Sequence, residues 1–215
     1  MPAAAIIYLI AVLAANLTAT MFIPIPLGGG AEVWISVGTL IFGITFTQRD
    51  RMHRFGRPFV YRIIFLGAFL NLIMMLSYRF IWGAPLVGYF HDQQWQWLAE
   101  SGEMLLDSGW QVFLASFIAM VVAESTDTEI YHKLLQKRWM VRVIRSNAVS
   151  VPVDSIVFNL IAFAGSPLFP VVVLLKIIMG EIVSKYSVGL LYALFYPMKD
   201  ADVTPPAADL PPPQS

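Results

Sequence analysis

Acidic side chains recur inside two segments of this sequence that are otherwise apolar. Glu124 and Asp127 are three residues apart and Tyr131 follows four residues later, so a helix would place all three on one face. Asp154 lies in the next apolar segment. A charge at membrane depth costs about 3 kcal/mol unless it is paired or faces a cavity. The pattern predicts a buried polar site at Asp127 and Asp154, whereas Glu124 fits an interfacial position equally well.

Further polar residues in apolar surroundings could complete this site. Asn147 precedes the second aspartate by seven residues, and Asn16 interrupts the first apolar segment. Lys176 lies inside the last apolar segment, where a cation could balance the carboxylates. Glu181 and Lys185 in that segment are spaced i,i+4, and a self-neutralising structural pair accounts for them as well as a site does.

The composition indicates that lipid surrounds most of the chain. Of 215 residues, 58% are hydrophobic and 13% are charged, against about 25% charged in average soluble domains. The net charge is zero, so the chain has no basic footprint for nucleic acid. The sequence contains no Cys and three scattered His, and it shows no hydrolase, metalloprotease or phosphate-loop motif. We therefore expect no enzymatic activity, no metal and no cofactor.

Six apolar segments are long enough to be considered as membrane spans, because a helix needs about 20 apolar residues to cross a bilayer. The predicted fold is an all-α, polytopic membrane protein with six transmembrane helices in one domain, residues 1–198. The predicted spans are 3–23, 33–47, 59–82, 109–123 with a polar extension to 131, 148–164 and 171–196.

The positions of the basic residues predict how these spans cross the membrane. Ten of the 14 Lys and Arg residues fall in two segments, 49–62 and 133–145, and basic segments stay in the cytoplasm. The segment 92–107 is acidic and would lie outside. Both termini of this multi-pass membrane protein are then cytoplasmic. Residues 199–215 are acidic and rich in proline, which predicts a disordered tail.

Two stretches of the sequence resemble a known family. The motif A-S-x-x-A at 115–119, followed by Asp127 and by H-K-L at 132–134, resembles a block of the VUT family of vitamin-uptake-like transporters, whose members carry queuosine precursors. The stretch 146–163, which runs from S-N through Asp154 to I-A-F, is similar to a second block of that family.

Weaker matches extend this resemblance beyond residues 113–164. Asn16 falls where the family has an S-N or A-N pair, Lys176 resembles a lysine of its last helix, and residues 50–56 resemble its D-x-x-x-R-x-x-G loop. The sequence departs from the family pattern at residues 47–51, which are basic where many members carry an acidic pattern.

The resemblance implies a six-helix inner-membrane carrier that imports 7-cyano- or 7-aminomethyl-7-deazaguanine. We expect this carrier to work by alternating access around a central polar site. A carboxylate can accept hydrogen bonds from the N–H edge of a guanine-like ring, so we expect Asp127 and Asp154 to hold this substrate. Asn16 and Asn147 would complete its hydrogen bonds, and Lys176 would balance the charge. The residues considered for stacking on the ring are Tyr131, Phe158 and Phe163.

Two other functions stay open on the sequence. The chain could be the substrate-binding subunit of a vitamin importer of the energy-coupling-factor type, which needs a separate energising module. It could also be a membrane scaffold without transport, whose polar residues only bind neighbouring helices.

Overall fold

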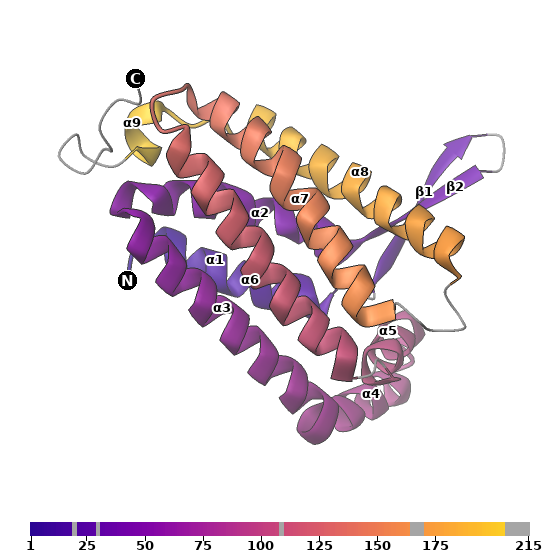
Figure 1. Ribbon diagram of the computed structural model, residues 1–215. Helices are drawn as coiled ribbons and strands as arrows, with labels where there is room; N and C mark the ends of the chain where they lie inside the picture. Colours follow the sequence, from indigo (N-terminus) through magenta and orange to yellow (C-terminus); the bar gives the residue numbers. More distant parts are fainter. Residues whose placement is uncertain (19–20, 29–30, 108–109, 164–169, 205–215) are drawn as a thin grey trace.

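A bundle of helices with one β-hairpin forms the structure, a computed structural model that describes residues 1–18, 21–28, 31–107, 110–163 and 170–204 (Figure 1). The predicted helical class is confirmed, with the hairpin as an addition. The elements are α1 (Ala3–Leu17), β1 (Phe22–Gly28), β2 (Ala31–Ser36), α2 (Val37–Met52), the 3₁₀ turn η1 (His53–Phe55), α3 (Arg57–Ser77), the π-helical turn η2 (Tyr78–Trp82), α4 (Gly83–Asp92), α5 (Gln96–Asp107), α6 (Trp110–Lys133), α7 (Trp139–Phe163), α8 (Val171–Phe195) and α9 (Asp200–Val203).

Three helical stretches within the described residues are long and apolar enough to cross a membrane. They are Arg57–Asp92, Trp139–Phe163 and Leu174–Phe195. A fourth is added if α5 and α6, which meet at a sharp bend, are taken as one broken span. α1 is apolar, but its 15 residues are fewer than the roughly 20 that a perpendicular span needs.

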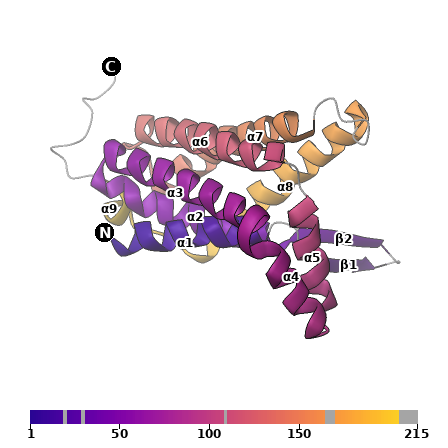
Figure 2. The same cartoon turned by 90° about the horizontal axis from the view of Figure 1, so that it is seen from below.

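The β-hairpin replaces the end of the predicted first span, 3–23, and the start of the second, 33–47, so α1 ends at Leu17. β1 and β2 are antiparallel, with Phe22 opposite Ser36. Two X-Pro steps explain the extended backbone, because a residue before proline is pushed out of the helical region; the prolines are Pro24 and Pro26. α2 consequently begins at residue 37 instead of 33. The hairpin projects from the end of the bundle opposite α9 (Figure 2).

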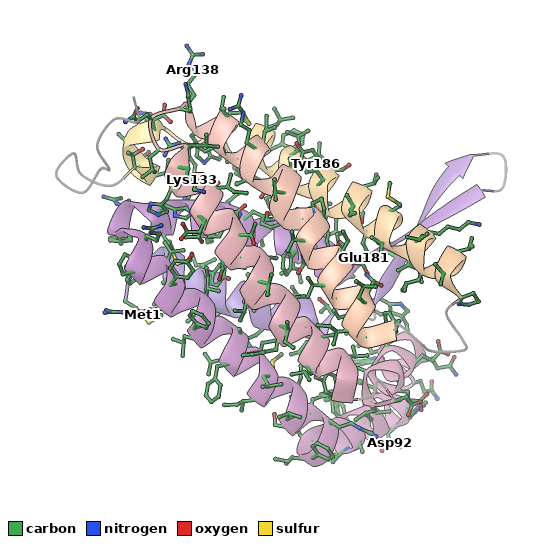
Figure 3. All side chains as sticks on the ribbon, in the orientation of Figure 1. Met1, Asp92, Lys133, Arg138, Glu181 and Tyr186 are labelled. Atoms are coloured by element: carbon green, nitrogen blue, oxygen red, sulfur yellow. The ribbon has the colours of Figure 1, made fainter. Side chains whose placement is uncertain are left out.

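The two basic segments lie at the same end of the bundle. Lys133 and Arg138 mark this end in Figure 3, and Asp92 of the acidic segment lies at the other. We call it the basic end. α7 starts there at Trp139, nine residues before the predicted span. Its first turn therefore includes Arg142, a residue that the sequence predicts to lie in a loop.

α9 docks on the start of α7, although it lies within the predicted tail. The Oδ1 atom of Asp200 accepts a hydrogen bond from the backbone N–H of Trp139 at 2.6 Å and one from Arg142 Nη2 at 2.7 Å. Val203 is buried in a cluster that includes Tyr131 and Trp139. Residues 205–215 of the predicted tail lie outside the described residues.

Glycines allow α2 and α8 to approach closely. Gly43 of α2 faces the ring of Tyr192, and Gly189 of α8 faces the ring of Phe46. α6 and α7 pack side by side over most of their length, and α1 and α3 cover α6 through a core that includes Tyr8 (Figures 1 and 2). The close approach of α2 and α8 brings the polar end of α2 into the bundle.

Replacing Gly43 with Ala is expected to lower the free energy of unfolding by about 1–3 kcal/mol, the usual cost of overpacking. The added Cβ would lie 2.9 Å from Cγ of Tyr192, so the whole side chain must rotate away. The matched control is Gly180→Ala on α8, where no described atom lies within 4 Å of the new Cβ. The thermal unfolding midpoints of the two variants are measured in detergent. Equal midpoints would contradict the close packing of Gly43 against Tyr192.

Candidate functional site

Arg49 forms the centre of a buried polar cluster that sequence reasoning missed. α2 carries it into the bundle, where its guanidinium meets two carboxylates of α6. Nη1 donates to Glu124 Oε2 at 2.9 Å, and Nη2 lies 3.0 Å from Asp127 Oδ2. The two acids lie on one helical face, as their spacing predicts. We call these three residues the Arg49 triad.

α7 adds two polar side chains to this cluster. Asn147 Oδ1 accepts a hydrogen bond from Arg49 Nη2 at 3.4 Å. The Ser150 hydroxyl donates to Asp127 Oδ1 at 3.0 Å. Both residues are buried, so α2, α6 and α7 are joined by polar contacts in the interior.

Lys185 of α8 forms a second cluster of the same kind. Its Nζ lies 3.0 Å from Asp154 Oδ2 of α7 and 2.9 Å from Glu181 Oε2 of α8. The i,i+4 pair considered on the sequence therefore exists, but it is not self-contained, because the ammonium also holds a carboxylate of the neighbouring helix. We call these three residues the Lys185 triad.

A narrow pocket separates the two triads. Its space admits about one water molecule. One carboxylate of each triad faces it, Glu124 from α6 and Asp154 from α7, while neither Asp127 nor Glu181 lines it. The lining residues come from α2, α6, α7 and α8: Phe42, Phe46, Arg49, Met120, Ala123, Glu124, Ser150, Val151, Asp154 and Lys185.

Two of the predicted site residues lie elsewhere. Asn16 joins α1 to α6, because its Oδ1 accepts a hydrogen bond from the Ser116 hydroxyl at 2.9 Å, and its Nδ2 donates within its own helix. Lys176 is exposed on α8, and no carboxylate of the described residues pairs with it. Arg49 and Lys185 pair with the carboxylates in its place.

The aromatic residues considered for stacking do not line the pocket. Tyr131 stacks on His53 at the basic end, with ring centroids 4.0 Å apart. Phe158 and Phe163 contact each other, with centroids 5.9 Å apart. Phe42 and Phe46 of α2 line the pocket instead, and their rings meet edge to face. The aromatic rings at the pocket therefore come from α2 and not from the residues that the sequence suggested.

A separate polar network closes the basic end. The indole Nε1 of Trp139 donates to Asp50 Oδ2 at 3.0 Å, and His53 Nδ1 lies 3.0 Å from His132 Nε2. Burial, followed by the neighbouring basic side chains, holds the pKa of His53 well below its usual value. The donor in the contact between the two rings depends on their tautomers.

Residues 36–198, about three quarters of the chain, match the sequence model of the family described as "Putative vitamin uptake transporter". The chain belongs to this family. No curated protein matches the chain, and no solved structure does. Family membership and the long apolar helices together make the protein a membrane protein of a transporter family, and the match includes both triads.

Proposed function

We propose that this member of the vitamin uptake transporter family is a multi-pass inner-membrane carrier that imports a queuosine precursor, 7-cyano- or 7-aminomethyl-7-deazaguanine. The observation that carries the proposal is the pocket between the two triads. It places acceptor carboxylates beside aromatic rings inside a bundle of apolar helices, which is the combination that a planar, donor-rich heterocycle requires.

The chemistry of the pocket suits a guanine-like ring. The pyrimidine edge of such a ring carries N–H donors, and a carboxylate such as Glu124 can accept two of them side by side. Arg49 lies beside this carboxylate and could donate to the ring carbonyl. Phe46 lines the pocket and could pack on the face of the ring.

Transport by this site requires the helices to move. The pocket admits about one water molecule and has no room for the substrate, so the proposal takes the structure as the closed state. In the proposed mechanism, α2 and α8 part from α6 and α7 on one side of the membrane and then on the other. We place the basic end and both termini in the cytoplasm and count six spans, with α1 and α2 as the two shorter ones.

Complementation tests this function directly. A bacterial strain that cannot synthesise 7-deazaguanines is given the gene and fed each precursor, and its tRNA is assayed for queuosine. We expect modified tRNA only when the protein is present. Unmodified tRNA in cells whose membranes contain the protein would contradict the proposal. Modification that appears only after an energising module is added would make the chain a binding subunit.

A further inference from the structure

The two carboxylates that face the pocket are both held by a shared cation. Arg49 holds Glu124 at the pocket and Asp127 behind it. Lys185 holds Asp154 at the pocket and keeps a second contact with Glu181 outside it. Either cation can therefore release its pocket carboxylate to a ligand without losing all its pairing.

The Arg49 triad shows how such a release is accommodated. Asp127 Oδ2 lies 3.0 Å from Arg49 Nη2, yet this oxygen and Arg49 Nε both lack an aligned hydrogen-bond partner among the described residues. When Glu124 turns to a ligand, the guanidinium can form the aligned contact with Asp127 that it now lacks. The exchange substitutes one charge-assisted hydrogen bond for another.

The charges around the pocket favour a cationic ligand. Each triad contains one more carboxylate than cations. An uncompensated charge is costly in a buried site, because its hydration is lost. A ligand that brings a positive group into the pocket supplies the missing compensation, whereas a neutral ligand leaves the negative excess in place.

The two triads differ in the donor that they can accept. The side chains of the Arg49 triad are almost fully buried, and the planar fork of Arg49 suits a fixed geometry. In the Lys185 triad, Lys185 is 17% exposed and Asp154 is 16% exposed. Lysine is a point charge on a flexible stem, so another ammonium can replace it at Asp154 with little change in geometry.

We propose that the pocket takes a planar, amide-containing heterocycle that carries a primary ammonium group. The ammonium binds Asp154 in place of Lys185, and the N–H edge of the ring binds Glu124. This inference rests on the proposed function and selects between its two substrates. The aminomethyl compound, which is protonated at neutral pH, is the substrate, and the neutral nitrile is a poor one.

The experiment measures the initial accumulation of 7-aminomethyl- and 7-cyano-7-deazaguanine in the complemented strain, by mass spectrometry of washed cells. The wild-type protein is expected to import the aminomethyl compound at least tenfold faster than the nitrile. Asp154→Asn should lower import of the aminomethyl compound at least tenfold and import of the nitrile less than twofold. The matched control is Glu129→Gln, which removes a half-exposed acid paired with Arg57 outside the pocket and should change neither rate.

If the Asp154→Asn variant does not reach the membrane, import of the two compounds by the wild-type protein still tests the inference. A neutral N-acetyl derivative of the aminomethyl compound should then fail to compete with the parent. Equal or faster import of the nitrile would overturn the inference while leaving the proposed function intact, and so would equal competition by the acetylated compound. Absence of import of both probes by a membrane-inserted protein would instead overturn the proposed function.

Discussion

Arg49→Met is expected to leave little folded protein in the membrane. The substitution leaves Glu124 and Asp127 buried without their cation. Breaking a buried ion pair by removing one partner costs about 3–5 kcal/mol, a large share of the 5–15 kcal/mol that stabilises a typical protein. The measurements are the yield of monodisperse protein extracted in detergent and its thermal unfolding midpoint.

Two further variants make this expectation specific. Arg51→Met removes an exposed arginine from the same helix and should leave both yield and midpoint near those of the wild type. Combining Arg49→Met with Glu124→Gln and Asp127→Asn removes all three charges, so it should restore part of the lost stability. An unchanged midpoint for Arg49→Met alone would show that the triad does not hold the bundle together.

Glu124→Gln is expected to fold and yet lose import. Arg49 keeps Asp127 as a partner, so a neutral ion pair remains in the interior. The ligand loses a hydrogen bond to a charged acceptor, which is worth about 1.5–3 kcal/mol. Because 1.4 kcal/mol corresponds to a factor of ten, import of the aminomethyl compound should fall about 10- to 100-fold.

Glu129→Gln serves as the control on the same helix, since its carboxylate pairs with Arg57 and accepts a hydrogen bond from Tyr61 away from the pocket. Import rates divided by the amount of protein in the membrane compare the two variants. A similar loss in both would point to a general electrostatic effect of α6. Full import by Glu124→Gln would remove this carboxylate from the proposed substrate site.

The long apolar helices could be predicted closely from the sequence. The ranges predicted for α3 with η2, for α6 and for α8 agree with the structure to within a few residues, because long uncharged runs identify such helices. The start of α7 could not be predicted, because Arg142 is buried beside Asp200, 58 residues further along the chain. Local hydropathy contains no information about a partner so distant.

The acids of the candidate site were easier to predict than their cations. Asp127 and Asp154 stand out because they interrupt apolar helices. Arg49 lies in a run of basic residues, and that pattern favours a cytoplasmic loop over a buried position. The acids were the signal that could have indicated buried cations, because buried carboxylates require compensation by cations from other helices.

The docking of α9 has a consequence for how the protein is assembled during synthesis. Asp200 caps the first turn of α7 from 61 residues further along the chain, so the ribosome makes this turn well before the carboxylate that caps it. Until residues 200–203 emerge, the Arg142 guanidinium has neither its carboxylate nor its cover. The nascent bundle is therefore left open at that end until the segment after α8 has been made.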